Sequence, residues 1–485
     1  MNSVPAPRVR ETAPSLREEA RQLMASPGAF FHHSVDEMHG IARSRLDDLQ
    51  LQAAALCFEE QVERIPMVAK LAGNQGIKRI EAVEDIVPLL FEHTMYKSYP
   101  VSFLGNRQFD KLTTWLNKMT SVDLSQVDAR GCDSIDGWLD LLAETTELDA
   151  VTTSGSTGTM SFIARMKTDI ERGFRSNRIT EFQSFGRPVA PGSVDGLIHV
   201  IWPIYADGHL MSFRAGQYLK KIFAQGREDH FHALYPEKGS SDLMWLAAQL
   251  RAAAARGDAS RVDVPPNLLA RRAELEAQQA NMGKHQMAFV ESLAETLRDQ
   301  RVYCMYPSYP LYQVAARGLA AGRSCHFSPD SSLGTAGGSK GMPLPEDWAE
   351  QVSRFFGIER LERYYGMSEI TGLSKMCPAG RYHTQPWIIP FILDPDTSAL
   401  QPRRGVQKGR GAFFDFTLRG HWGGIITGDE LEIDFSGPCA CGQTSTHMSP
   451  VVERFGAKRG GDDKITCAAA PQAHTDAVEF LTTFS

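Results

Sequence analysis

A short run of hydroxyl side chains and glycines is the segment of this sequence best suited to chemistry. Residues 152–159 read TTSGSTGT, with four hydroxyl side chains and two glycines from Thr153 to Gly158. Glycines let a backbone approach an anion closely, and successive N–H groups and hydroxyls can surround phosphate oxygens. The run is not a Walker A loop, because no Lys-Ser/Thr pair follows its second glycine. From these residues alone, a phosphate-binding loop and a flexible surface turn are both open interpretations.

Two acidic residues farther along the chain suit a nucleotide site. Glu369 ends the segment 364–369 (YYGMSE), and Mg²⁺ is typically held by one or two carboxylates plus phosphate oxygens. Asp429 follows the apolar pair Ile425-Ile426, where we expect a strand to end, and an aspartate there can accept hydrogen bonds from both ribose hydroxyls. Either residue taken singly is more typical of a solvated acid. The order and spacing of the three segments favour one common site.

In this order the segments resemble the adenylate-forming superfamily, which includes acyl-CoA synthetases, adenylation domains and firefly-type luciferases. The family's phosphate loop begins Thr-Ser-Gly-Ser-Thr-Gly, as residues 153–158 do. Its Tyr-Gly-x-Thr/Ser-Glu and Thr-Gly-Asp motifs match residues 365–369 and 427–429. The resemblance implies an α/β fold with a large core of α/β subdomains, a small β-rich subdomain and a mobile C-terminal domain.

The resemblance also implies roles for individual residues. Glu369, Lys340 and Ser368 would be catalytic, with Glu369 holding Mg²⁺ and Lys340 reaching the nucleotide or the acyl carboxylate. Tyr365 would pack on adenine and Asp429 would fix the ribose. The implied nucleotide-binding residues are Thr153, Ser154, Gly155, Ser156, Thr157, Gly158, Gly337, Gly338, Ser339, Tyr365, Gly366 and Asp429.

The nearer branches of the family are the phenylacetate-CoA ligases and the acyl-protein synthetase of bacterial bioluminescence. The former carry a Gly-Pro-Cys-x-Cys-Gly segment, matched by residues 437–442, and the latter a Gly-Gly-x-x-Lys segment, approximated by residues 336–341 (AGGSKG). The chain departs from the family at the Pro-Lys that follows the loop, which is Met160-Ser161 here. It departs again at a Pro-x-x-His segment, which appears as Pro203-Ile204-Tyr205.

The C-terminal part of the family pattern is short in this chain. Residues 461–464 (GDDK) resemble the hinge before the mobile domain, and the sequence runs only to Ser485. We therefore expect residues 461–485 to be a remnant of a mostly absent C-terminal domain. The lysine that this domain contributes to adenylation then has no counterpart.

Three thiols and an imidazole suggest a metal site. Cys377 and His383 lie at the two ends of one short loop, and Cys439 and Cys441 lie in another. Four such ligands suit a closed tetrahedral Zn²⁺ site, although the Cys-x-Cys spacing is tighter than usual and buried free cysteines are the alternative. Some phenylacetate-type ligases resemble this arrangement. A zinc with four protein ligands would be structural, clamping the two loops.

The pattern along the chain predicts three regions: a helical region over 1–150, a nucleotide- and acyl-binding core over 151–460, and the remnant after it. Residues 196–205 predict a buried strand, and the alternation of strands and helices after residue 302 predicts a mainly parallel sheet. Short strands and turns are expected after His383. The helical segment near 241–300 is either a lid or partner surface, or a solvated helix pair. Residues 198–205 and 303–312 are expected to border the acyl site, with plain core as the alternative.

Composition excludes several other classes of protein. Lys and Arg total 51 against 58 Asp and Glu, and the net charge of −7 disfavours a nucleic-acid partner. Eight cysteines in 485 residues are too few for a disulfide scaffold and indicate a reducing compartment. No apolar run approaches the roughly 18 residues of a membrane span. We expect a cytoplasmic protein with no membrane or nucleic-acid partner.

The sequence thus predicts ATP-dependent activation of a small carboxylic acid to an acyl-adenylate, with release of pyrophosphate. Acyl transfer to a thiol or amine would follow, with CoA, a carrier protein or a partner enzyme as acceptor. The alternative is a catalytically inactive nucleotide-binding subunit of a larger complex. ATP, Mg²⁺ and a structural Zn²⁺ are the expected cofactors.

Overall fold

The structure is a computed structural model. It describes residues 14–153, 159–183, 185, 196–256, 262, 264–336, 343–359 and 361–455. The predicted remnant over 461–485 lies outside these residues.

The first part of the described chain is mainly helical. Its helices are capped by the residues expected at helix ends: the Ser15 side chain accepts the N–H of Glu18 at the start of α1, and Gly76 ends α5 at φ 67°. The elements are α1 (Leu16–Ala25), α2 (Pro27–Phe30), α3 (Val35–Gly40), α4 (Arg43–Gln61), α5 (Pro66–Gln75), the 3₁₀ helices η1 (Val83–Leu89) and η2 (His93–Lys97), β1 (Phe91–Glu92), α6 (Ser102–Gly105), α7 (Phe109–Leu116) and α8 (Ile135–Thr145).

A six-stranded sheet forms the centre of the next part, and five of its strands are parallel. The strand order is β5-β4-β6-β7-β8-β9, and β9 is antiparallel to β8. The predicted α/β class and the mainly parallel sheet are confirmed. The strands are β4 (His199–Gly208), β5 (Phe231–Gly239), β6 (Val302–Met305), β7 (Ser332–Ala336), β8 (Glu362–Tyr365) and β9 (Ser374–Lys375).

Helices cover this sheet, as expected for strands that are apolar on both faces. Helix α10 packs against β4, α13 against β5, and α9 and α14 against β7. Three helices, α11 to α13, lie within the segment near 241–300. The helices and the short 3₁₀ turn are α9 (Lys167–Phe182), α10 (Met211–Ile222), η3 (Glu228–His230), α11 (Ser241–Arg256), α12 (Pro266–Ala270), α13 (Arg272–Thr296), α14 (Ser308–Ala320) and α15 (Trp348–Phe356).

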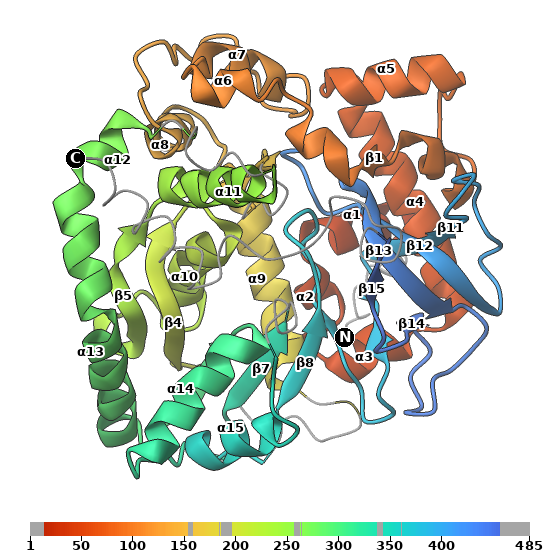
Figure 1. Ribbon diagram of the computed structural model, residues 1–485. Coiled ribbons are helices and arrows are strands. Elements are labelled where there is room, and N and C mark those ends of the chain that lie inside the picture. The colour runs from red at the N-terminus through yellow and green to blue at the C-terminus, as the bar shows by residue number, and fades with distance from the viewer. Residues whose placement is uncertain are drawn as a thin grey trace, which may run out of the picture.

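A second, mainly antiparallel sheet follows and lies beside α1 and α4 (Figure 1). Its main order is β10-β14-β13-β12-β11, and β1 and β15 also pair with β13. The expectation of short strands is wrong for β12 and β13, which have 10 and 11 residues and pair with each other along most of their length. The strands are β10 (Tyr382–His383), β11 (Ile388–Leu393), β12 (Val406–Asp415), β13 (Gly424–Asp434), β14 (His447–Met448) and β15 (Glu453–Arg454).

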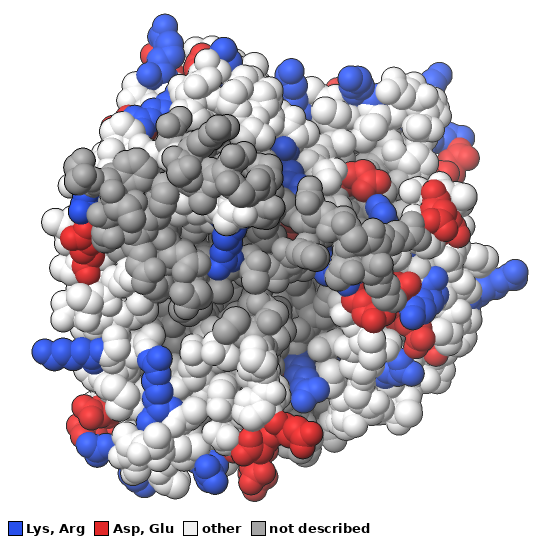
Figure 2. All heavy atoms as spheres, in the orientation of Figure 1, with Lys and Arg blue, Asp and Glu red and all other residues white. Residues whose placement is uncertain are grey.

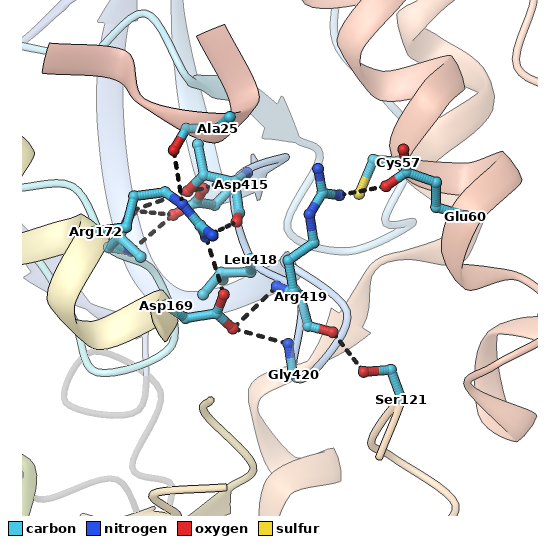
Figure 3. A network of polar contacts seen from close by, with 12 residues as sticks. Ala25, Cys57, Glu60, Ser121, Asp169, Arg172, Asp415, Leu418, Arg419 and Gly420 are labelled. Atoms are coloured by element: carbon cyan, nitrogen blue, oxygen red, sulfur yellow. Dashed lines mark hydrogen bonds and ion pairs between the residues drawn. The ribbon is translucent and has the colours of Figure 1, made fainter. Parts of the chain in front are cut away.

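A buried carboxylate holds the turn between β12 and β13 in place (Figure 3). Asp169, in the first turn of α9, accepts the backbone N–H groups of Arg419 and Gly420 at 2.9 and 2.8 Å. Arg172, one turn later, donates to Asp169 at 3.0 Å. On the other side, Arg419 forms an ion pair with Glu60 of α4 at 2.9 Å. One turn therefore connects the antiparallel sheet to α9 and to the N-terminal helices.

On the face drawn in Figure 2, basic and acidic side chains of the described residues are interspersed, without a broad basic patch. None of the helices in the described part of the chain combines the length and the apolar character needed to cross a membrane.

Candidate active site

The candidate site lies at the carboxyl edge of the parallel sheet. Because β4, β6, β7 and β8 run in the same direction, their carboxyl ends lie at one edge, which is where open α/β sheets bind ligands. Tyr365 ends β8, and Gly366 follows it at this edge. Ser368 and Glu369 come directly afterwards in the chain.

The predicted phosphate loop begins near this edge, between the paired strands β2 (Val151–Thr152) and β3 (Phe162–Ile163). The N–H of Thr152 donates to the carbonyl of His209, just after β4, at 2.7 Å. Thr153 N–H donates to the carbonyl of Ser161 at 3.2 Å. The remaining predicted residues of the two nucleotide segments lie outside the described residues: Ser154, Gly155, Ser156, Thr157, Gly158, Gly337, Gly338, Ser339 and Lys340.

Asp429 lies across from the end of β8 and is buried. The phenol of Tyr365 donates to Asp429 Oδ2 at 2.9 Å, and Arg454 Nε lies 2.7 Å from Asp429 Oδ1. The expectation that Asp429 ends a strand is wrong: β13 continues to Asp434, because the alternation in residues 430–434 (ELEID) keeps one side of the strand apolar. Asp429 is instead paired in register with Arg454 of β15.

Glu369 lies half-buried near the same group of charges. Burial raises the pKa of its carboxyl, and the neighbouring cations Arg165 and Arg454 oppose that shift. The negative charge of Asp429, like burial, raises the pKa of Glu369. Two acidic and two basic groups therefore interact at this edge of the sheet, and a bound cation would favour the ionised form of Glu369.

Two buried side chains that sequence reasoning missed hold the backbone around Glu369. Arg165, only 2% exposed, donates through Nη2 to the carbonyl oxygens of Ser368 and Ile370, the first at 2.6 Å. The ring N–H of buried His421 donates to the carbonyl of Glu369 itself at 3.2 Å. Three successive carbonyls are thus fixed. The signal in the sequence was an arginine inside the apolar run 162–166 (FIARM).

A buried aspartate anchors the residues that follow. Asp415 Oδ2 accepts both the N–H and the hydroxyl of Thr371, each at 2.7 Å. Its Oδ1 accepts the N–H and the hydroxyl of Thr417 at 3.0 and 2.6 Å. Residues 368–371 are therefore connected to the segment just after β3 by Arg165 and to the antiparallel sheet by Asp415.

The four predicted metal ligands lie together. The ligand atoms of Cys377, His383, Cys439 and Cys441 all lie within 4.8 Å of one another. The Cys377 and Cys439 sulfurs are 3.7 Å apart, and Cys441 Sγ lies 3.3 Å from His383 Nε2. Ligands about 2.3 Å from a tetrahedral zinc would be separated by about 3.8 Å, so these residues fit such an ion.

A hydroxyl behind the cluster orients its histidine. His383 Nδ1 lies 2.7 Å from Ser445 Oγ, which also lies 2.9 Å from Nδ1 of buried His39 in α3. The hydrogen bond on Nδ1 leaves Nε2 of His383 directed toward the sulfurs, as a metal-binding histidine requires. The N–H groups of Thr444 and Ser445 donate to the carbonyl of His39 at 2.9 and 3.1 Å. The cysteine loop is therefore attached to the N-terminal helices.

The two segments expected to border an acyl site line one cavity. Pro203, Ile204 and Tyr205 of β4 form part of its wall, and Tyr306 and Pro310 contribute from the second segment. Helix α13 also lines this cavity.

No protein-family model matches the sequence, and no curated protein matches it. Among solved structures, the chain is similar to a 2-hydroxyisobutyryl-CoA ligase in complex with 2-HIB-AMP and CoA, with 11% identity, 86% of this chain and 71% of that chain covered, and a TM-score of 0.46. It is similar to ATP-bound MatB from Rhodopseudomonas palustris, with 14% identity, 61% and 47% covered, and a TM-score of 0.32. It is also similar to the luciferase-like enzyme of the Zophobas morio mealworm, with 15% identity, 62% and 57% covered, and a TM-score of 0.32.

Proposed function

We propose that this chain is an adenylate-forming ligase, which activates a carboxylic acid with ATP and passes the acyl group to a thiol or amine. The observation that supports the proposal is the contact between two of the motif segments, residues 365–369 and 427–429, beside the carboxyl edge of the parallel sheet. Tyr365 contacts Asp429, and Arg165, which follows the loop hairpin, holds the backbone on both sides of Glu369. These contacts support a common site for the segments that carry Tyr365, Glu369 and Asp429.

In the first step, a carboxylate oxygen of the acid attacks the α-phosphorus of ATP. The bond from that phosphorus to the bridging oxygen of the β-phosphate breaks, and pyrophosphate leaves with the electron pair. Such a reaction needs positioning and charge neutralisation more than covalent help from the protein. In this proposal Ser154, Ser156 and Thr157 bind the phosphates, and Tyr365 packs on adenine.

Asp429 is suited to hold the ribose. Both of its oxygens already accept protein donors, but each carboxylate oxygen has a second lone pair for a ribose hydroxyl. Glu369, with its half-buried carboxylate, is suited to hold Mg²⁺, which would supply positive charge beside the phosphates. Ser368 and Lys340 remain proposed catalytic residues.

In the second step, the lone pair of a thiol or amine attacks the acyl carbonyl, and AMP leaves as the acceptor loses its proton. CoA, a carrier-protein thiol or a partner enzyme could each be the acceptor. The free cysteines in the described part of the chain agree with a cytoplasmic enzyme.

We also propose that the Cys377, His383, Cys439 and Cys441 cluster holds a structural zinc. Four protein ligands leave no open position for a substrate, so the ion would stabilise the fold rather than catalyse. The metal would join the loop of Cys377 and His383 to the loop of Cys439 and Cys441, and the second loop is attached to α3 through hydrogen bonds with His39.

ATP–pyrophosphate exchange with a panel of carboxylic acids tests the proposed function, with mass spectrometry to detect the acyl-AMP. We expect exchange with at least one acid, and a loss of roughly 100-fold or more in Glu369→Gln. Glu350→Gln, an exposed residue of α15, is the matched control and should retain full activity. Nucleotide binding without exchange for any acid would contradict the proposal and favour the inactive nucleotide-binding subunit.

A further inference from the structure

A cavity of about 90 Å³ lies between the strands β4 and β5 and the helices α13 and α14. Figure 1 shows α13 running beside β5, with α14 next to it. A cavity needs at least about 10–15 Å³ to hold one water molecule. This cavity therefore has room for roughly six to nine non-hydrogen atoms, each counted as about the size of a water molecule. Its apolar lining includes Ile204, Phe213, Leu234, Met282, Val290 and Val314.

The cavity lies beside the candidate active site. Tyr306 directly follows β6, which is two strands from β8 in the sheet, and Glu237 lies near the carboxyl end of β5. Adjacent strands are about 4.8 Å apart, so the lining extends roughly 10 Å across the strand ends, from Tyr306 toward Glu237 and away from Glu369. A ligand with its carboxylate near Tyr306 would direct its far end toward Glu237.

Two hydrogen-bond acceptors at this cavity lack partners. Among the described residues, nothing donates to Glu237 Oε2 or to Gln279 Oε1, and both atoms are buried. Buried polar atoms are normally satisfied, so an orphaned acceptor beside a cavity indicates a donor on a bound molecule. Gln286, also in the lining, already hydrogen-bonds Tyr235. Arg317 and His285 complete the polar lining.

Helix α13 supplies one wall of the cavity. Gln278, Met282 and Gln286 recur every four residues and so share one face of the helix, and all three line the cavity. Ala280 and Glu291 of the same helix are exposed. This helix is thus not part of a fully solvated pair, and its inner face is available to contact a substrate.

We infer that this cavity holds the chain of the acid, and that Glu237 and Gln279 select an acid whose far end carries a hydrogen-bond donor. This inference rests on the proposed function and deepens it. The donor is a hydroxyl or an ammonium group at the end of an apolar chain of roughly six to nine atoms. A methyl end would leave both acceptors unpaired, and a carboxylate end would be repelled by Glu237.

The test uses the full chain with straight-chain acids of about six to nine atoms that end in methyl, hydroxyl, ammonium or carboxylate. Pyrophosphate exchange gives kcat/KM, and saturation-transfer NMR gives acid binding without requiring turnover. We expect acids with a hydroxyl or ammonium end to exceed the methyl acids at least tenfold. Glu237→Gln should lower kcat/KM for the ammonium acids, relative to the methyl acids, at least tenfold more than it lowers kcat/KM for the hydroxyl acids. Glu291→Gln should change neither ratio.

Met282→Trp fills the cavity and should lower binding and exchange for all acids at least tenfold, while Ala280→Trp on the exposed face should change neither. Two results would overturn the inference and leave the ligase function standing. One is faster exchange with acids that have a methyl or carboxylate end, and the other is exchange that neither Glu237→Gln nor Met282→Trp changes. Binding that follows the expected preference, without exchange for any acid, would support the cavity assignment and overturn the ligase function.

Discussion

The phenol of Tyr365 donates to Asp429 Oδ2 at 2.9 Å and so connects the parallel sheet to the antiparallel sheet. Tyr365 ends β8 of the parallel sheet, and Asp429 lies within β13 of the antiparallel sheet. The other oxygen of Asp429 faces Arg454 at 2.7 Å. A nucleotide held at this point would contact both sheets at once.

Tyr365→Phe removes this hydrogen bond while keeping the ring. We expect the free energy of unfolding to fall by about 1 kcal/mol, because a net hydrogen bond contributes about that much and Asp429 keeps its ion pair with Arg454. Urea unfolding followed by circular dichroism measures the change. Tyr382→Phe is the control, because no hydrogen bond of its hydroxyl is seen among the described residues and its ring centre is only 6.3 Å from that of Tyr365. Equal decreases in the free energy of unfolding of both variants would show that the hydrogen bond from Tyr365 to Asp429 does not contribute to stability.

Arg165→Met tests whether the buried guanidinium positions the residues around Glu369. We expect a loss of roughly 2–4 kcal/mol in stability, because the carbonyls of Ser368 and Ile370 lose a charged donor inside the protein. The Mg²⁺ concentration for half-maximal exchange should also rise several-fold, which a purely structural role would not predict. Arg354→Met, at an exposed position of α15, should change stability by less than about 0.5 kcal/mol. An unchanged Mg²⁺ requirement in a folded Arg165→Met would remove the positioning role.

Protonation of His421 should contribute to the pH dependence of the free energy of unfolding. Burial, assisted by the charge of Arg165, lowers the pKa of this imidazole from 6.5 to about 4. Below pH 6.5 the unfolded chain takes up a proton that the folded chain refuses, so stability is lost as the pH falls from about 6.5 to 4. The loss amounts to at most roughly 3 kcal/mol. Urea unfolding from pH 7 to 4 measures it, and His421→Gln should flatten this part of the profile; an unchanged slope would contradict the prediction.

Purified protein should contain one zinc ion per chain by elemental analysis. Cys439→Ser should lose the ion and lower the unfolding midpoint by on the order of 5 °C or more, because structural zinc contributes directly to folding. Cys132→Ser is the control, since Cys132 is partly exposed and lies outside the cluster. Full zinc content in Cys439→Ser would refute the proposed ligand set.

Much of the fold follows from local patterns in the sequence. Residues 200–205 (VIWPIY) are apolar on both faces, which is typical of a central parallel strand, and they form part of β4. The metal ligands could be predicted because cysteine and histidine are typical zinc ligands and can be recognised by residue type alone. Asp429 was misplaced at a strand end because Thr427 and Gly428 follow the apolar pair Ile425-Ile426, while the alternation that continues the strand comes after Asp429.

The partners of Arg165 could not be predicted. Its two acceptors are backbone carbonyls 203 and 205 residues away. Every residue has a backbone carbonyl, so the sequence does not indicate which carbonyls accept these hydrogen bonds. The hydroxyl of Ser445 between His39 and His383 is a similar case, because its two partners are 406 and 62 residues distant. Polar contacts of this kind depend on tertiary packing rather than on local propensity.

The turn that Asp169 holds also has a consequence for the order of folding. Gly420 pairs with Asp169, 251 residues earlier, and β1 pairs with residues 425–426, more than 300 residues after it. Closing such long loops slows folding, and the early helices cannot complete their contacts until residues 425–426 have left the ribosome. Helices α1 to α5 would therefore remain partly exposed until a strand more than 300 residues later has been synthesised.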